Sequence, residues 1–210
     1  MSLPVMTGLI GLVYIVVFGG LSLLRREGLS LRFAGEALIV TAFAELVIIL
    51  LAIPLHPVLF VLILYLVTLR VRILVDLANS FAKRGNFVQA DRIYSLATRL
   101  GPDTTNKLII EVNRAIMLLQ ENKLDDSISA FTEVLYEADQ GYLGVKYEAA
   151  VHFNLGVAYL RKSNHSLATI EFNSAIDTWP ASLYANRAQQ ALNRLHHKDS
   201  APAEDKSANS

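Results

Sequence analysis

One ionisable residue, Glu45, raises the first chemical question about this chain, because it lies near the middle of the apolar segment 37–53. In a membrane, a carboxylate at this depth costs several kcal/mol unless it is protonated or paired, so it is a candidate intramembrane polar site. Proton transfer is one interpretation. The other is a protonated Glu45 that hydrogen-bonds to a hydroxyl such as that of Tyr14, or to a neighbouring subunit. No second acidic residue stands at matching depth, which favours helix–helix contact.

The remaining residue types form no catalytic or metal-binding set. The chain has no cysteine, which excludes disulfides, thiolate metal sites and cysteine nucleophiles. The adjacent His196 and His197 lie in a stretch without apolar periodicity, and the other histidines share no ligand spacing with them. We find no nucleophile–base set, phosphate-binding glycine loop or metal-ligand cluster. We therefore expect no enzyme, no cofactor and no metal.

Apolar and charged residues are segregated along the chain. Hydrophobic residues make up 53% of the sequence and charged residues 18%, and the first 69 residues contain three Arg, three Glu and almost no other charge. The formal net charge of +0 provides no clustered basic face for nucleic acid. This composition predicts a membrane module followed by a water-exposed domain.

Three apolar segments, 4–24, 37–53 and 57–75, predict three transmembrane helices, since about 20 apolar residues cross a bilayer. No basic region precedes the first segment, and we expect a retained anchor instead of a signal peptide. Basic residues occur in the loop after the first segment and again after the third. By the positive-inside rule, we expect the N-terminus and the uncharged second loop outside, and the first loop and the chain after the third segment in the cytoplasm. The basic residues are Arg25, Arg26 and Arg32 in the loop, Arg70 and Arg72 near the end of the third segment, and Lys83 and Arg84 beyond it.

Beyond the third segment, a repeated spacing of small residues predicts helical hairpins. In each of three copies, the small residue of one helix precedes the small residue of the next by twelve positions, and in two copies a proline follows after twelve more. Small residues let two helices approach closely, and proline stops the second helix. The positions are Ala78, Ala90 and Pro102; Ala115 and Ser127 without the proline; and Gly156, Ala168 and Pro180.

This pattern resembles the tetratricopeptide repeat (TPR) family over residues 71–196. The resemblance implies an all-α fold, in which three N-terminal transmembrane helices (the module 1–70) precede an α-solenoid of about three TPR hairpins. The repeats are expected at 71–104, 108–141 and 149–182, with a capping helix at 182–196. The tail 197–210 has the composition of a disordered segment.

The resemblance also implies a concave protein-binding groove lined by the first helix of each hairpin. Asn79 and Asn113 fit the pattern of repeats that clamp chaperone carboxylate tails, but Val75, Ala150 and Asn154 stand where that pattern requires basic residues. An apolar groove would instead suit an amphipathic helix. Alternatively, some of these residues are core or are covered by the segment 139–146. The expected groove residues are Asn79, Lys83, Val112, Ile116, Leu119, Phe153, Val157, Leu160 and Arg161.

These features predict a multi-pass, membrane-anchored TPR scaffold or adaptor. It would mediate protein–protein interaction or the assembly of a membrane complex at the cytoplasmic face. The alternative is a permanent structural subunit of a larger integral membrane assembly. The expected partners are other proteins, membrane or membrane-associated, and the lipid bilayer, with no nucleic acid; a homo-oligomer is compatible with the sequence.

Overall fold

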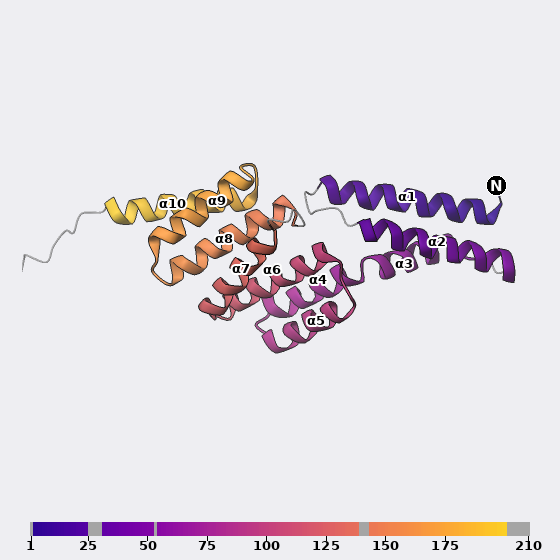
Figure 1. Ribbon diagram of the computed structural model, residues 1–210, viewed down its shortest axis with the longest axis horizontal. Helices are drawn as coiled ribbons and strands as arrows, with labels where there is room; N and C mark the ends of the chain where they lie inside the picture. Colours follow the sequence, from indigo (N-terminus) through magenta and orange to yellow (C-terminus); the bar gives the residue numbers. More distant parts are fainter. Residues whose placement is uncertain (1, 25–30, 53, 139–142, 201–210) are drawn as a thin grey trace, which may run out of the picture.

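The protein is all-α in the computed structural model, which describes residues 2–24, 31–52, 54–138 and 143–200. Within these ranges it contains ten helices and no strand, arranged as an elongated body with the N-terminal helices at one end (Figure 1). The all-α prediction is confirmed. The helices are α1 (Leu3–Leu24), α2 (Leu31–Leu51), α3 (Pro57–Thr68), α4 (Arg70–Lys83), α5 (Phe87–Arg99), α6 (Thr104–Gln120), α7 (Leu124–Ala138), α8 (Val145–Arg161), α9 (His165–Thr178) and α10 (Leu183–Ser200).

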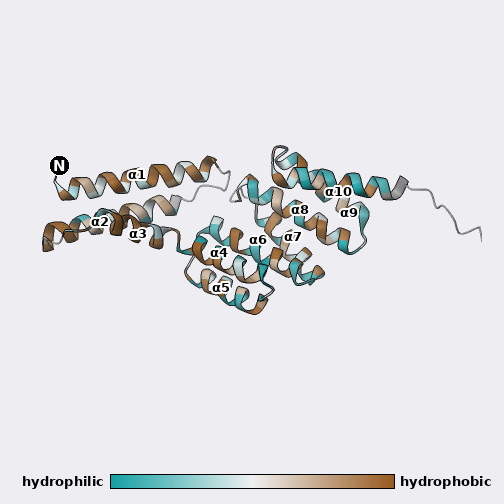
Figure 2. Ribbon diagram, turned by 180° about the vertical axis from the view of Figure 1, so that it is seen from behind, coloured by the Kyte–Doolittle hydropathy of each residue, from teal (hydrophilic) through white to brown (hydrophobic). Residues whose placement is uncertain are grey.

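Helices α1–α3 form the N-terminal module, which is apolar both inside and outside. Its small core contains Tyr14, Ala37, Ala44, Phe60 and Leu64. Most of the large apolar side chains on the three helices are nevertheless exposed, and the module is almost uniformly hydrophobic in Figure 2. By length and composition, α1 and the Arg32–Leu51 part of α2 could each cross a membrane; a third span exists only if α3 and α4 are counted together.

The third apolar segment of the sequence is not one straight helix. Helices α3 and α4 meet at Leu69 with a bend of 72°, so the apolar part ends at Thr68. The Thr68 hydroxyl donates to the carbonyl of Leu64 (2.7 Å), a contact that often bends helices. Arg70, directly after the bend, donates to the carbonyl of Val67 (2.6 Å). With twelve residues, α3 is about 18 Å long, well short of a bilayer core of about 30 Å.

Helices α4–α10 form the repeat domain, in which three helical hairpins are followed by α10. The turns of the hairpins are equivalent: Gly85, Asn122 and Ser163 each follow the small residue of the first helix by seven positions, and each has a left-handed φ, of 77°, 65° and 60°. The second helices of the first and third hairpins are capped at their N-termini by Asn86 and Asn164, whose side chains accept from Gln89 N (3.3 Å) and Leu167 N (3.2 Å). The middle hairpin therefore has the same turn as its neighbours, although its sequence is more divergent.

The small residues lie where the two helices of each hairpin meet. Ala78, Ala90, Ala115, Ser127 and Ala168 are fully buried. In the middle hairpin, the Ser127 hydroxyl donates to the carbonyl of Ala115 (2.9 Å), which satisfies the only polar group among these five side chains. In the third hairpin, a Cβ added to Gly156 would lie 2.7 Å from Cδ1 of Phe172. Because the helices of each hairpin can meet only at small side chains, the spacing of small residues indicates the repeats better than overall hydrophobicity does.

Three apolar clusters fill the space within and between the hairpins. Each second helix carries an aromatic residue four positions after its small residue. These residues are Tyr94 on α5, Phe131 on α7 and Phe172 on α9, and each is fully buried in its own cluster. The third cluster extends onto α10 through Ala188, Leu192 and Leu195. Helix α10 therefore packs on the third hairpin through this cluster.

We expect Ala168→Trp to destabilise the repeat domain, because Ala168 is fully buried where α9 meets α8. Overpacking of this kind costs about 1–3 kcal/mol of unfolding free energy, or more. Thermal unfolding of the detergent-purified protein, followed by circular dichroism, measures the change. Ile170→Trp is the matched control on the same helix, since Ile170 is largely exposed. An unchanged melting temperature for Ala168→Trp would contradict the helix contact described above.

Candidate functional site

The predicted groove residues divide into buried, bonded and accessible groups. Val112 and Leu119 are only 1% and 4% exposed and belong to the cluster of the middle hairpin. Leu143, which directly follows the undescribed residues 139–142, is buried in the same cluster. Val112 and Leu119 are therefore core residues and cannot line an open groove, which corrects their assignment from the sequence.

The two asparagines on the first helices are engaged with each other. The Tyr94 hydroxyl donates to Asn79 Oδ1, Asn79 Nδ2 donates to Asn113 Oδ1 (3.0 Å), and Asn113 Nδ2 donates to the carbonyl of Ile109 (2.7 Å). Burial raises the pKa of Tyr94 above its ordinary value near 10, so the hydroxyl stays protonated and keeps donating. This chain of hydrogen bonds joins α4, α5 and α6. In the structure, Asn79 therefore ties the first two hairpins together, a role that the sequence did not reveal.

The other predicted groove residues keep part of their surface accessible. Ile116 and Val157 are half-buried against the cluster of the middle hairpin, and Phe153, Val157 and Leu160 against that of the third. Lys83 and Arg161 are exposed at the ends of α4 and α8, and Arg161 donates to the carbonyl of Leu119 (2.8 Å). The first helices thus keep a partly apolar accessible surface, with a basic side chain at the C-terminal end of α4 and of α8.

Glu45 lies against the backbone of α1. A Cβ added to Gly8 would collide with a carboxylate oxygen of Glu45, and one added to Gly11 would collide with the Thr41 side chain. The two glycines therefore permit the close approach of α1 and α2. The Tyr14 hydroxyl, which the sequence suggested as a partner for Glu45, instead forms a hydrogen bond with Thr68 Oγ1 (2.8 Å). Glu45 fills a helix–helix contact in the structure.

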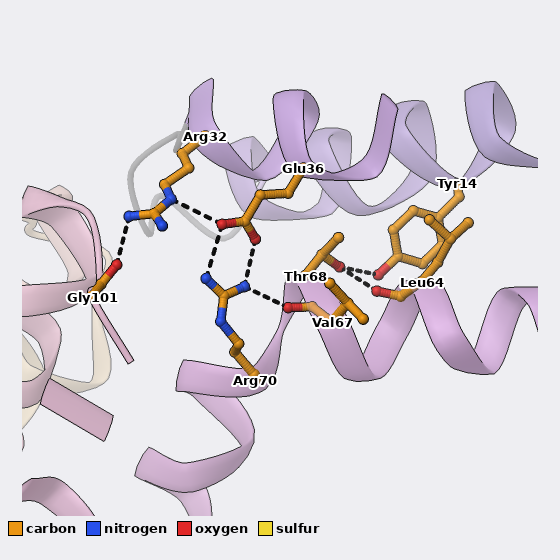
Figure 3. Close-up of polar contacts among 8 residues, drawn as sticks. All are labelled: Tyr14, Arg32, Glu36, Leu64, Val67, Thr68, Arg70 and Gly101. Carbon is orange, nitrogen blue, oxygen red and sulfur yellow. Dashed lines mark hydrogen bonds and ion pairs between the residues drawn. The ribbon is translucent and has the colours of Figure 1, made fainter. Parts of the chain in front are cut away.

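A charged cluster at the junction of the two parts was not predicted from the sequence. Figure 3 shows Arg70 reaching back from the start of α4 to Glu36 on α2, with distances of 2.5 and 2.9 Å to the two carboxylate oxygens. Arg32 also contacts Glu36 (2.9 Å) and donates to the carbonyl of Gly101 between α5 and α6 (2.5 Å). The cluster thus joins the N-terminal module to the first hairpin. The spacing of Arg32 and Glu36 was a visible signal, whereas the approach of Arg70 depends on the bend at Leu69.

Beside this cluster lies a cavity of about 500 Å³ between the N-terminal module and the repeat domain. Its walls come from the ends of α1, α2 and α3 on one side and from the beginnings of α4, α6 and α8 on the other. It is therefore bounded by apolar helices and by the first helices of all three hairpins.

Other titratable side chains form no larger constellation in the described ranges. His152 Nδ1 and Glu171 Oε2 are 2.8 Å apart and link α8 to α9. The described residues include no group of three or more His, Asp or Glu side chains that could hold a metal ion. The junction cluster, the adjoining cavity and the accessible part of the first-helix face are thus the features that can serve an interaction.

The architecture places the chain among all-α proteins with a TPR-like helical repeat, because three hairpins share spacing, turn geometry and packing. No family model matches the chain, and no curated protein sequence matches it. Among solved structures, the chain is similar to the N-terminal domain of stress-induced protein-1 (STI-1) from C. elegans, with 18% identity and a TM-score of 0.47 over 58% of this chain and 93% of that chain. A similarity of this extent establishes neither a family nor a function.

We expect Glu36→Gln to loosen the junction, since the neutral amide cannot replace a carboxylate between two guanidinium groups. A charge-assisted hydrogen bond contributes about 1.5–3 kcal/mol. Spin labels at Ile39 on α2 and Val88 on α5, both largely exposed, would report a broader distance distribution. Glu111→Gln on α6, outside the cluster, is the control. An unchanged distribution for Glu36→Gln would show that packing alone orients the two parts.

Proposed function

We propose that this protein is a membrane-anchored scaffold. In this proposal, the N-terminal module holds the repeat domain at the cytoplasmic face of a membrane, and the repeat domain binds other proteins of a membrane complex. The observation that carries the proposal is the division of exposed apolar surface between the two parts. Val16, Ile39 and Val58, one from each helix of the module, are 64–70% exposed, whereas the repeat domain encloses its large clusters.

An apolar surface that covers three neighbouring helices requires a cover. Monomeric soluble proteins seldom expose contiguous apolar patches beyond a few hundred Å². Lipid provides such a cover for helices whose backbone groups are bonded internally, as they are in α1 and α2. The arginines at the inner ends of the apolar segments support the cytoplasmic position of the repeat domain.

A protein-binding role for the repeat domain follows from its form. The first helices of neighbouring hairpins contact one another, and Ile116, Phe153, Val157 and Leu160 on α6 and α8 keep part of their apolar surface accessible. The described residues include no group of three side chains that could hold a metal ion. The hydrogen-bond networks around Glu36 and Asn79 join parts of the fold to one another. Recognition of proteins is the activity that this surface supports best.

The shortness of α3 favours a second candidate function, that of a permanent subunit of a larger integral membrane assembly. At about 18 Å, α3 does not cover the depth of a bilayer core by itself. Its exposed side chains, among them Val58, Leu62 and Leu66, could be covered by helices of another subunit as well as by lipid. Detergent-purified protein that elutes alone supports the scaffold, whereas fixed stoichiometry with other membrane subunits supports this alternative.

We expect a reporter fused after Ser210 to be active only if the reporter functions in the cytoplasm. The arginines after the first and third apolar segments would keep both regions on that side. Activity is compared between a cytoplasmic reporter and one that functions only outside, with a fusion after Met1 as the opposite control. Outside activity of the C-terminal fusion would overturn the proposed topology and the compartment of the partners.

We expect Ile116→Glu combined with Val157→Glu to abolish partner recovery after affinity purification from the native host. Each buried apolar contact with a partner gives roughly 1.5–3 kcal/mol, and a carboxylate at both positions removes two such contacts. The matched control, Val88→Glu with Ile170→Glu, makes the same changes at exposed positions on α5 and α9. Quantitative mass spectrometry compares the recovered proteins, and circular dichroism checks the fold.

Lys83→Glu provides a second variant for the same surface, since Lys83 is exposed and its substitution leaves the core intact. It should reduce recovery without changing the melting temperature. Unchanged recovery with both folded variants would place recognition elsewhere on the molecule.

A further inference from the structure

The end of α1 extends beyond the end of α3 and lines a cavity that it shares with the repeat domain. The Tyr14 hydroxyl is level with Thr68, the last residue of α3. From Tyr14, α1 continues to Leu24, which adds about 15 Å of helix. This end remains apolar and exposed: Leu23 and Leu24 are 62% and 79% exposed. An apolar helix end therefore lines the same cavity as charged residues from the beginnings of α4 and α8.

The cavity of about 500 Å³ lies between these two surfaces, with an apolar wall on α1 and an opposite wall that holds three charged residues among apolar ones. Phe18 and Leu21 of α1 line the apolar wall. Arg72, Asp76 and Lys146 line the opposite wall, so two cationic side chains stand against one carboxylate. Binding pockets for small molecules commonly have volumes of about 300–1,000 Å³, and this cavity lies within that range.

We propose that this cavity binds the headgroup of an anionic phospholipid from the cytoplasmic leaflet. The phosphate lies toward Arg72 and Lys146, and the acyl chains follow Phe18 and Leu21 along α1. The inference rests on the proposed membrane anchoring, which places the inner end of α1 at the headgroup level.

The two walls discriminate against other occupants. An apolar protein helix would remove the charged groups of Arg72, Asp76 and Lys146 from water, and such desolvation is unfavourable. A free phosphate compound would leave the apolar wall in contact with water. A phospholipid matches both walls, because its phosphate meets the cations and its acyl chains stay continuous with the bilayer beside α1.

Two neighbouring glycines provide a matched test. Gly19 lines the cavity, and Gly20 is exposed and does not. A Cβ added at either position meets no atom within 4 Å, so both accept a side chain without a collision at Cβ. Gly19→Phe should fill the cavity and displace the lipid, whereas Gly20→Phe adds the same apolar group to the same helix and should leave lipid binding unchanged.

The measurement is native mass spectrometry of the full chain in detergent, with phosphatidylglycerol or phosphatidylcholine of identical acyl chains added. Wild-type protein and Gly20→Phe should bind phosphatidylglycerol preferentially, and Gly19→Phe should lose this binding. Arg72→Gln and Lys146→Gln should each weaken it about five-fold, without effect on phosphatidylcholine. Arg92→Gln with Arg194→Gln, on α5 and α10, removes two exposed charges elsewhere and should change nothing.

Equal binding of the two lipids by the wild-type protein, or equal binding by the two glycine variants, would overturn the proposal. Stabilisation by glycerol phosphate that equals the effect of the lipid would also overturn it, in favour of a free phosphate compound. Flotation with vesicles separates this inference from the membrane anchoring itself. If the wild-type protein floats but selects no lipid, the lipid site alone is wrong; if it does not float, the proposed anchoring is wrong.

Discussion

The Arg70 guanidinium holds the Glu36 carboxylate at the point where an apolar helix is followed by an amphipathic one. On one side of this contact, α1–α3 expose apolar side chains around a small core. On the other side, the hairpins bury their apolar side chains in three clusters. The bend of 72° at Leu69 redirects the chain between these two environments. Arg32 extends the same cluster to Gly101, so α2 is tied both to the start of α4 and to the segment that follows α5.

Beyond this junction, the fold depends on small side chains at helix contacts. Ala78, Ala90, Ala115, Ser127 and Ala168 allow the paired helices to approach, and the aromatic rings four residues later on the second helices fill the space behind them. In the N-terminal module, Gly8 and Gly11 serve the same purpose against Glu45 and Thr41. Close backbone approach thus organises both parts, although one part encloses its apolar residues and the other exposes them.

The accessible surfaces follow from this arrangement. Hydrogen bonds among Tyr94, Asn79 and Asn113 join the first two hairpins, which commits these amides to the fold. What stays accessible on the first helices is a set of half-buried apolar residues, together with the charged beginnings of α4 and α8 near the end of α1. The proposed protein partners and the proposed lipid would therefore meet the same face at different ends.

The sequence by itself determined the all-α class, the apolar character of the N-terminal segments and the register of the hairpins. These properties follow from local spacing: two small residues twelve positions apart in each hairpin, a turn seven residues after the first of them, and runs of apolar residues. The surface of the first helices was only partly predictable. Val112 and Leu119 have the helical spacing of groove residues, but their exposure depends on what packs over them, and Leu143 shares their cluster.

Only the tertiary structure decided the contacts between residues far apart in sequence. Arg70 meets Glu36 because the helix bends at Leu69, and neither residue type predicts that bend. Tyr14 pairs with Thr68 instead of Glu45 because α1 packs against α3 at that depth. The cavity is lined by residues as far apart in the sequence as Phe18 and Tyr147, on helices α1 to α4, α6 and α8. Local spacing determines which helices form, whereas the direction in which one helix leaves another determines which side chains meet.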